Sequence, residues 1–589
     1  MSFWGRYAKD LRELLELLEA GKQHKAQGKL AKRMAVLFEK SKASNVTLYP
    51  IDIDIDNKSS PRATALRIET VDTIGFLYEF SNALALRGLH IARVNIGSSG
   101  NRVQDTLYIT NARGKKITNP QEQRELRAAA VLTKHFTHLL PNAPNPEAAL
   151  LSFREFLQTL FSRPNWPDQF VSLEQPHALD ALARLLGVSE FLWNDFLRMQ
   201  YLNLLPMVHN TGALAAAKSK DALRAELQAA LQAAPTGKAA RKALNVFKDR
   251  EMFRIDMRHI TGQTAKFGQF SAELTNLAEV VVEAAYLLCR NELTARYGEP
   301  RLDNGAPNPM SVCALGKCGG QELGFASDIE LIFIYQGSGQ TNGKNRIAAL
   351  EFYEKLVTAT AKAIRAKQEG IFEVDLRLRP YGSAGSLAVS LASFQRYYAP
   401  DGPVWAYERQ ALVKLRPIAG DETFGKRLLA LRDRFVYSGE AFDAAAMRSI
   451  RERQIRHLVR PGAFNAKHSP GGLVDVEYLV QGLQITHGAQ NPALRLSNTR
   501  QAMTALHQAG ILSDEDYRRL REAHIFLRRL INALRMVHGN AKDLTLPPAD
   551  SEEFAFLARR LNYGNHTARL SQYLNRHTGF VQEINRRLL

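Results

Sequence analysis

Leu315-Gly-Lys-Cys-Gly-Gly-Gln-Glu-Leu-Gly-Phe-Ala-Ser-Asp-Ile-Glu-Leu-Ile-Phe-Ile-Tyr335 is the stretch that decides the fold of this chain. A glycine-rich turn leads into a run of strongly β-forming residues, and Asp328 and Glu330 stand two apart where that run begins. Because side chains alternate between the two faces of a strand, both carboxylates point to one face. The opposite, apolar face is lined by Ile329, Leu331 and Phe333. Two carboxylates held together repel each other, so the pattern predicts a cation between them, with Mg²⁺ as the candidate.

A second stretch, Phe372-Glu-Val-Asp-Leu-Arg-Leu-Arg-Pro380, alternates as a strand should. Its predicted polar face carries Glu373, Asp375, Arg377 and Arg379. Asp375 offers a third carboxylate for a metal, and the two guanidinium groups suit phosphate. The following loop, Tyr381-Gly-Ser-Ala-Gly-Ser-Leu387, has the glycines that let a backbone approach a ligand.

Each of these features also has an ordinary structural explanation. An Asp-x-Glu pair on a strand is usually surface alternation, Gly319-Gly320 is usually a turn, and the charges from Glu373 to Arg379 can form an ion-pair ladder. Their order along the chain, however, matches nucleotidyltransferase chemistry. Amides beside Gly319 and Gly320 would bind a triphosphate, and the three carboxylates would bind Mg²⁺. The phosphate-binding loop motif of other nucleotide-binding proteins is missing, because Cys318 follows Lys317 where Ser or Thr is required.

Length, composition and charge limit the class of protein to which these motifs can belong. The 589 residues suggest three to five domains, and 45% hydrophobic with 23% charged residues is ordinary globular composition. No run of eighteen apolar residues and no signal peptide are found, and three Cys cannot form a disulfide framework, so we expect buried thiols in a cytoplasmic protein without membrane contact. The net charge of +19 suits an anionic substrate, and the spread of basic residues argues against nucleic acid as the partner.

The hydrophobic patterns divide the chain into five parts. We expect a helical N-terminal extension over 1–60, with a strand in its last third, and a β-α-β-β unit over 61–120. A mostly helical region over 121–300 ends in a Pro/Gly linker. Mixed α/β structure follows over 301–435, and the chain is helical over 436–589. The fold class is therefore multidomain α+β.

The motifs closely resemble those of the glutamine synthetase adenylyltransferase family. Besides the two stretches quoted above, Trp405-Ala-Tyr-Glu-Arg-Gln-Ala-Leu-Val-Lys-Leu-Arg-Pro-Ile-Ala-Gly-Asp421 looks like that family's third block. Lys467-His-Ser-Pro-Gly-Gly-Leu-Val-Asp-Val-Glu-Tyr-Leu-Val-Gln481 is similar to the opening of its C-terminal helical domain. Phe247-Lys-Asp-Arg-Glu-Met-Phe-Arg-Ile-Asp-Met-Arg-His-Ile260 is similar to the helix before its catalytic core. The resemblance implies a polymerase-beta-like nucleotidyltransferase core followed by a C-terminal helical bundle.

Site residues follow from the resemblance by motif. It implies that Asp328, Glu330 and Asp375 hold Mg²⁺ and that Gly319, Gly320 and Ser327 contact the triphosphate of ATP. Arg377 and Arg379 are added from strand geometry as further phosphate ligands. The family usually has Asp where this chain has Glu330. Asp475 and Glu477 fall in a strong family block, with helix capping as the alternative role.

Residues 61–120 resemble an ACT domain, a ferredoxin-like module that senses amino acids. Asp72-Thr-Ile-Gly-Phe-Leu77 matches its ligand loop, so Asp72, Gly75 and Phe76 are the expected effector residues, with glutamine or another amino acid as effector. A purely structural ACT domain is the alternative. Uridylyltransferases of the signalling protein PII also carry ACT domains.

The expected reaction is transfer of AMP from ATP to a tyrosine of glutamine synthetase, gated by an amino acid. Three alternatives stay open. They are phosphorolytic removal of AMP from glutamine synthetase, uridylylation of a PII-like protein, and a non-catalytic protein that senses a nucleotide or an amino acid or binds RNA.

Overall fold

The computed structural model describes residues 3–40, 51–99, 102–139, 146–162, 166, 216–234, 236–260, 263–264, 266–366, 371–399, 402–440, 442–538, 543–564 and 566–588. The sequence Gly100-Asn101, which is typical of a hairpin turn and for which we expect one, lies outside these ranges. The chain divides into two compact units, Met1–Ala215 and Ala216–Leu589. Among the described helices, none has the length and apolar character that a membrane crossing requires.

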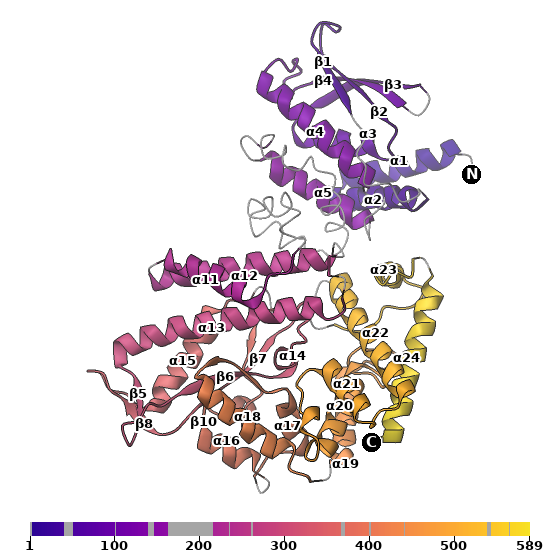
Figure 1. Ribbon diagram of the computed structural model, residues 1–589. Helices are drawn as coiled ribbons and strands as arrows, with labels where there is room; N and C mark the ends of the chain where they lie inside the picture. Colours follow the sequence, from indigo (N-terminus) through magenta and orange to yellow (C-terminus); the bar gives the residue numbers. More distant parts are fainter. Residues whose placement is uncertain are drawn as a thin grey trace. The chain divides into compact units, whose positions relative to one another are not determined.

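The first unit contains one antiparallel sheet and five described helices (Figure 1). Its strands, which pair in the order β1-β2-β4-β3, are β1 (Asp52–Asp56), β2 (Thr64–Val71), β3 (His90–Ser99) and β4 (Arg102–Thr110). Its helices are α1 (Phe3–Glu19), α2 (Gln23–Lys40), α3 (Phe76–Leu86), α4 (Pro120–Leu139) and α5 (Pro146–Phe161).

The sheet of the first unit has the β-α-β-β order that the sequence predicts, with β1 as a fourth strand. Alternation along β2 buries Leu66 and Ile68, and Phe80 of α3 is buried as well. α4 packs against α3, so this sheet and its helices span residues 52–139.

The second unit is built around a five-stranded mixed sheet. β7 (Ile329–Tyr335) is its central strand, and β6 and β11 follow on one side in antiparallel pairing. On the other side both β9 and β10 pair with β7 in parallel, β9 at its beginning and β10 at its end. The bounds of these partners are β6 (Met310–Ala314), β9 (Val374–Asp375), β10 (Ala388–Ser390) and β11 (Arg416–Gly420). A separate ribbon pairs β5 (Pro300–Leu302) with β8 (Gly339–Thr341).

Helices cover both faces of this sheet. α13 and α15 pack against its strands from one side, and α16 and α18 from the other (Figure 1). On the side of α16 and α18, the side chains of Ile332 and Ile334 share a core with Phe394 and Leu428. The bounds are α13 (Gln269–Tyr297), α15 (Ala349–Ala363), α16 (Leu391–Tyr398) and α18 (Glu422–Val436). This is the mixed α/β structure expected over 301–435.

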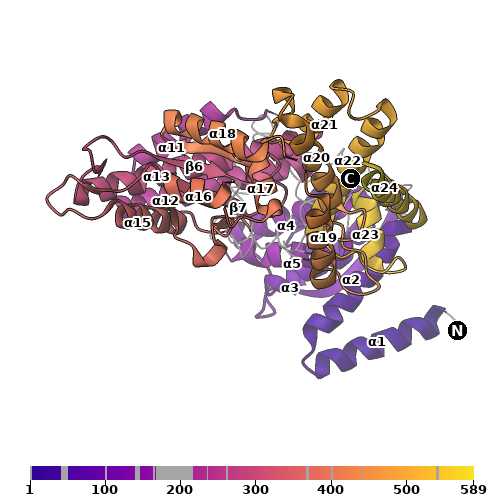
Figure 2. The same cartoon turned by 90° about the horizontal axis from the view of Figure 1, so that it is seen from below.

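The chain is helical from α19 onward, as predicted. These helices gather beside the sheet rather than over it (Figure 2). They share an apolar core to which α20, α21, α22 and α24 all contribute. Their bounds are α19 (Ala444–Leu458), α20 (Leu473–Gly488), α21 (Thr499–Gln508), α22 (Asp514–His538), α23 (Glu552–Arg560) and α24 (Thr567–Leu588). We call residues 444–588 the C-terminal helical part.

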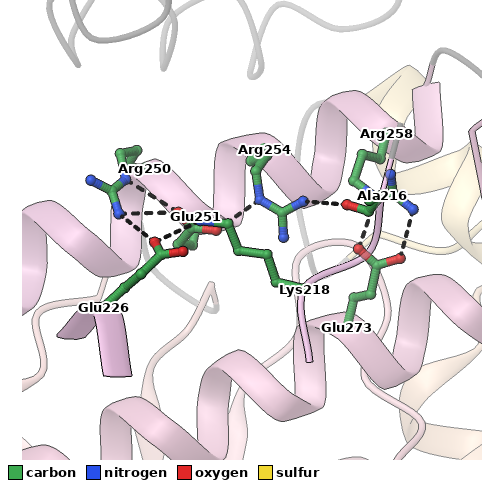
Figure 3. Close-up of polar contacts among 8 residues, drawn as sticks. All are labelled: Ala216, Lys218, Glu226, Arg250, Glu251, Arg254, Arg258 and Glu273. Carbon is green, nitrogen blue, oxygen red and sulfur yellow. Dashed lines mark hydrogen bonds and ion pairs between the residues drawn. The ribbon is translucent and has the colours of Figure 1, made fainter. Parts of the chain in front are cut away.

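Buried ion pairs join the helices that precede the sheet (Figure 3). On α12 (Gly237–Ile260), Arg254 Nε donates to Glu251 at 2.7 Å, and Arg258 Nε donates to Glu273 of α13 at 2.9 Å. Lys218, just before α11 (Lys220–Gln232), reaches Glu251 at 2.9 Å. A buried charge without a partner is costly, so these pairs fix the three helices against one another.

Candidate active site

The glycine-rich turn sits directly between β6 and β7. Leu315 leaves β6, and its amide donates to the carbonyl of Glu330 at 2.9 Å, which ties the turn to the neighbouring strand. Residues Gly316–Gly319 then form the single helical turn α14. Gly316 has a φ of +49°, and a Cβ at this position would lie 2.8–3.0 Å from the carboxyl group of Glu330. Glycine therefore lets the Glu330 side chain lie directly against the turn.

Gly319 and Gly320 are needed for space. A Cβ on Gly319 would lie 1.9 Å from the carbonyl oxygen of Lys414, and one on Gly320 would lie 3.1 Å from that of Ser497. Their amides donate within the turn, Gly319 to Leu315 at 2.7 Å and Gly320 to Gly316 at 3.0 Å. That Gly319 and Gly320 contact a triphosphate thus remains a prediction. In this conformation their own amide hydrogens are already bonded within the turn and would not bind it.

The three predicted carboxylates lie on adjacent strands. Asp328 immediately precedes β7, Glu330 is its second residue, and β7 pairs with β9 so that Glu330 stands beside Asp375. As the alternation predicts, Ile329 is fully buried, whereas Asp328 and Glu330 are only partly buried. A strand pair with one apolar and one acidic face therefore brings the three carboxylates together.

Two of these carboxylates lack the partners that burial demands. Asp328 Oδ1 and Glu330 Oε2 are buried, and neither has a hydrogen-bond partner among the described residues. Burial raises the pKa of Asp328, and the nearby carboxylates of Glu373 and Asp375 raise it further. Burial also raises the pKa of Glu330, against the opposing charge of Lys317. Unpaired, mutually repelling carboxylate oxygens are the donor set that a hard divalent cation neutralises.

Asp375 has a different environment. Its carboxylate accepts hydrogen bonds from the amide of Arg377 at 2.8 Å and from the guanidinium group of the same residue at 2.6 and 3.0 Å. Burial raises the pKa of Asp375, but these bonds lower it by more, so the net shift is downward. Within the described ranges, no group of three His, Cys, Asp or Glu side chains is arranged to hold a metal ion. With Asp375 paired to Arg377, two of the three carboxylates are left for a cation in this conformation.

The second predicted strand is much shorter than the sequence pattern suggests. Only Val374 and Asp375 form β9, and the chain turns immediately afterwards. Arg379 then folds back, donating to the carbonyl of Gly385 at 3.1 Å and to that of Ser383 at 3.2 Å. The prediction that one extended face carries all four charged residues from Glu373 to Arg379 is therefore wrong. Arg379 shapes the loop, while Arg377 is largely exposed beside Asp375.

Ser327 lies between the turn and the C-terminal helical part. Its hydroxyl oxygen accepts from the amide of Gly324 at 3.1 Å and from Arg535 of α22 at 3.3 Å. The same guanidinium group donates to the carbonyl of Phe325 at 2.6 Å. Helix α22 thus reaches into the segment that carries the carboxylates.

The sequence analysis missed a group of cations around the carboxylates. Lys317 of α14, Lys467 before α20 and Arg535 of α22 all exert an electrostatic effect on one another or on Glu330. Two of them stand inside quoted motifs, so Lys317 and Lys467 could have been singled out. Arg535 is one of many arginines in the last third of the chain, and nothing in its sequence context distinguishes it.

One ion pair connects the turn to the helical part. Glu322 accepts from Lys414 Nζ at 2.7 Å and from the amide of Thr499 at 2.6 Å, while its own carbonyl accepts from Arg528 at 2.5 Å. Its amide donates to the carbonyl of Lys317 at 2.7 Å. The end of the glycine-rich turn is therefore held by residues from α21 and α22.

Asp475 and Glu477, the two acidic residues of the family block that begins at Lys467, lie beside basic side chains. Asp475 accepts from the amide of Gly471 at 2.7 Å and from Arg451 at 2.6 Å, which is the capping role weighed against a catalytic one. Glu477 lies 3.8 Å from Lys414. The three cysteines are buried as predicted, and burial raises the pKa of each thiol.

The predicted effector loop lies in the first unit, at the start of α3. Gly75 precedes the helix with a φ of 81°, which favours glycine, and Asp72 is exposed. The side chain of Phe76 is buried and stacks on Phe80, with a ring-centroid distance of 5.5 Å. Lys134 Nζ donates to the carbonyl of Val71 and lies 5.3 Å from the centre of the Phe76 ring. Asp72 and Gly75 can face a ligand, whereas Phe76 serves the core.

Three family models match consecutive parts of the chain. Residues 179–431 match the family described as glutamate-ammonia ligase adenylyltransferase, and residues 444–589 match GlnD PII-uridylyltransferase. Residues 52–140 match the ACR9-like, ACT-like domain. Residues 179–431 are therefore similar to the adenylyltransferase family and residues 52–140 to an ACT-like domain, as the motifs indicate.

Curated relatives carry the name bifunctional glutamine synthetase adenylyltransferase/adenylyl-removing enzyme. The protein of Thioalkalivibrio sulfidiphilus is 31% identical over 413 residues, which cover 69% of this chain and 42% of the relative. That of Stenotrophomonas maltophilia is 36% identical, covering 50% of this chain and 32% of the relative. That of Bordetella pertussis is 34% identical, covering 58% and 38%. The chain thus spans less than half the length of these relatives.

Proposed function

We propose that this chain, whose adenylyltransferase-family domain carries the acidic strand pair, transfers AMP from ATP to a tyrosine of glutamine synthetase. The observation that carries the proposal is the pair of buried, unpartnered carboxylate oxygens on Asp328 and Glu330, beside Asp375 on the next strand. The relatives named above act on glutamine synthetase by their printed name, which supplies the target. The reaction would take place in the cytoplasm, as for a regulator of nitrogen assimilation.

In this reaction the tyrosyl oxygen forms a bond to the α-phosphorus of ATP. The bond from that phosphorus to the bridging oxygen breaks, pyrophosphate leaves with the electron pair, and the tyrosyl proton is released. Asp328, Glu330 and Asp375 would hold Mg²⁺, which would neutralise phosphate charge when bound. The strand pair fixes the spacing of these carboxylates, and Arg377 fixes the orientation of Asp375. Pre-set positions of this kind supply much of the acceleration in phosphoryl and nucleotidyl transfer.

The test is AMP transfer measured by intact mass on glutamine synthetase from the same host. Asp328→Asn should lower the rate at least about 100-fold, because it removes one of the carboxylates that would hold Mg²⁺. Asp303→Asn, at an exposed position in the same domain, is the matched control. Full transfer by Asp328→Asn would refute the assignment of this residue.

Two other reactions are outcomes of the same assay. The relatives are named as adenylyl-removing enzymes too, so premodified glutamine synthetase with phosphate tests for phosphorolytic removal of AMP. The match of residues 444–589 to a PII-uridylyltransferase favours an arm with UTP and a PII-like protein. No transfer in any arm would favour a non-catalytic nucleotide sensor.

The regulatory part of the proposal concerns the ACT-like domain. An amino acid such as glutamine would bind at the loop that contains Asp72 and Gly75, where glycine frees the backbone for a carboxylate. The exposed side chain of Asp72 supports this position. Calorimetric titration with glutamine and other amino acids is the test, and a chain that gives no binding heat would exclude sensing at this domain.

A further inference from the structure

Three cations whose charge acts on Asp328 or Glu330 form no ion pair with a carboxylate in the part of the chain that the structure describes. Within the described ranges, Lys317 Nζ and Lys467 Nζ have neither a hydrogen-bond partner nor an ion-pair partner. Arg535 uses one guanidinium nitrogen for the carbonyl of Phe325 and the hydroxyl of Ser327, while its Nε is buried without a partner.

Lys317 and Lys467 are partly buried and Arg535 is buried. Like the buried Arg528, which donates to the carbonyl of Glu322, they differ from the cations of the second unit that are paired with a carboxylate. Lys414 is paired with Glu322 at 2.7 Å, and Arg258 with Glu273 at 2.9 Å, the latter shown in Figure 3. A protein normally pairs a buried charge because desolvation costs several kcal/mol. Cations kept unpaired at one place therefore point to an anion that arrives from outside.

The positive charges act on one another. Burial lowers the pKa of Lys317, and the charges of Arg535 and Lys467 lower it further. Burial likewise lowers the pKa of Lys467, and Arg535 contributes to that shift. The pKa of Arg535 falls to about 10 through burial and the charge of Arg528. The three positive charges thus lie close enough to interact electrostatically, and the charges of Lys317 and Lys467 also act on Glu330.

The three residues come from different parts of the chain. Lys317 belongs to the glycine-rich turn, next to the glycine against which the Glu330 carboxylate lies. Lys467 and Arg535 belong to the helical part, where Lys467 precedes α20 and Arg535 lies on α22. The bond from Arg528 to the carbonyl of Glu322 holds α22 against the end of the turn. The helical part therefore completes the site with positive charge.

We propose that Lys317, Lys467 and Arg535 bind the polyphosphate tail of the nucleotide and retain it as the leaving pyrophosphate. This inference rests on the proposed nucleotidyl transfer, because it assigns these residues to the phosphate groups beyond the α-phosphorus. The carboxylates, which would hold Mg²⁺, then lie toward the reacting phosphate, and Lys317, Lys467 and Arg535 lie toward the tail. The nucleoside base makes no contribution to this contact, so the cations would serve ATP and UTP alike.

The test compares binding of inorganic tripolyphosphate with binding of AMP, in the same Mg²⁺ buffer, by calorimetry on the full chain. Lys467→Gln and Arg535→Gln should each weaken tripolyphosphate binding about 10-fold or more, since a charge-assisted phosphate contact is lost. AMP binding should change less than about 3-fold, because AMP has no tail to reach the cations. Arg529→Gln, at an exposed position of the same helix, and Lys426→Gln on α18 are the matched controls.

A purely structural role would give a different result. If Arg535→Gln only loosened the packing of α22, tripolyphosphate and AMP would lose affinity together, and Arg535→Lys would not restore the difference between them. That result, or unchanged tripolyphosphate binding in the Lys467 and Arg535 variants, would overturn the inference. Tripolyphosphate binding needs neither glutamine synthetase nor ATP. The inference about the three cations can therefore fail while AMP transfer is observed, and it can hold while AMP transfer is not.

Discussion

Gly316→Ala should displace the Glu330 carboxylate and lower the rate of the reaction, while it lowers the stability of the fold only slightly. A Cβ at residue 316 would lie 2.8 Å from the Glu330 carboxyl carbon and 2.9 and 3.0 Å from its two oxygens, whereas ordinary contacts begin near 3.4 Å. The carboxylate would have to retreat by about half an ångström. Because a displacement of about 1 Å at a reacting group costs about 100-fold in rate, we expect about a 10-fold loss of the proposed AMP transfer.

The cost in stability should be small and measurable separately. Gly316 has a φ of +49°, so alanine there costs about 1–2 kcal/mol of backbone strain. Gly564→Ala is the matched control, since its φ is +57° and a Cβ there meets nothing within 4 Å. The two variants should unfold at similar temperatures, while only Gly316→Ala loses activity. A Gly316→Ala enzyme with the wild-type rate, or one far less stable than the control, would refute this reasoning.

Two further predictions concern buried charge in the second unit. Burial lowers the pKa of His524 to about 4, from 6.5 in an unfolded chain, so the unfolded state binds the proton first and stability falls as pH drops from 6.5 to 4. Denaturant titrations over this range should show that His524→Phe removes up to about 3 kcal/mol of that loss. Glu273→Gln leaves Arg258 without its carboxylate and should cost about 3–5 kcal/mol, against at most about 1 kcal/mol for Glu292→Gln in a more exposed pair with Arg241. Equal thermal shifts in these two variants would show that burial of the pair is unimportant.

The acidic centre could be predicted from sequence because its geometry is local. Alternation along one strand fixes which side chains share a face, and this placed Asp328 and Glu330 together. The neighbouring Asp375 followed from a second alternating stretch, and the structure pairs the two strands in parallel. Metal binding by these residues stays a prediction.

The rest of the second stretch could not be predicted from alternation. Beyond Asp375 the path of the chain is set by contacts within the following loop, where Arg379 donates hydrogen bonds to the carbonyl oxygens of Ser383 and Gly385. A charged residue at strand spacing is therefore weak evidence for a strand when a glycine-rich loop follows. Phe76 illustrates the opposite case, because an aromatic residue beside a ligand loop can equally belong to the core.

The contribution of the helical part depends on tertiary contacts alone. Glu322 meets Thr499, and Ser327 meets Arg535, across long separations in sequence. No periodic pattern within one element reports such contacts. The N-terminal sheet gives a milder example. The alternation over Asn45–Asp56 predicts a strand in the N-terminal extension, whereas β1 (Asp52–Asp56) pairs with β2 and so belongs to the sheet.

The hydrogen bond from Arg535 to the carbonyl of Phe325 can form only late in the synthesis of the chain. These residues are 210 positions apart. At about 5–20 residues per second, a ribosome makes the glycine-rich turn roughly 10–40 s before the arginine that closes it. During that interval the nascent chain carries the acidic strand without α22. Activity should therefore appear only once α22 has been made, so that a stalled ribosome leaves an inert fragment.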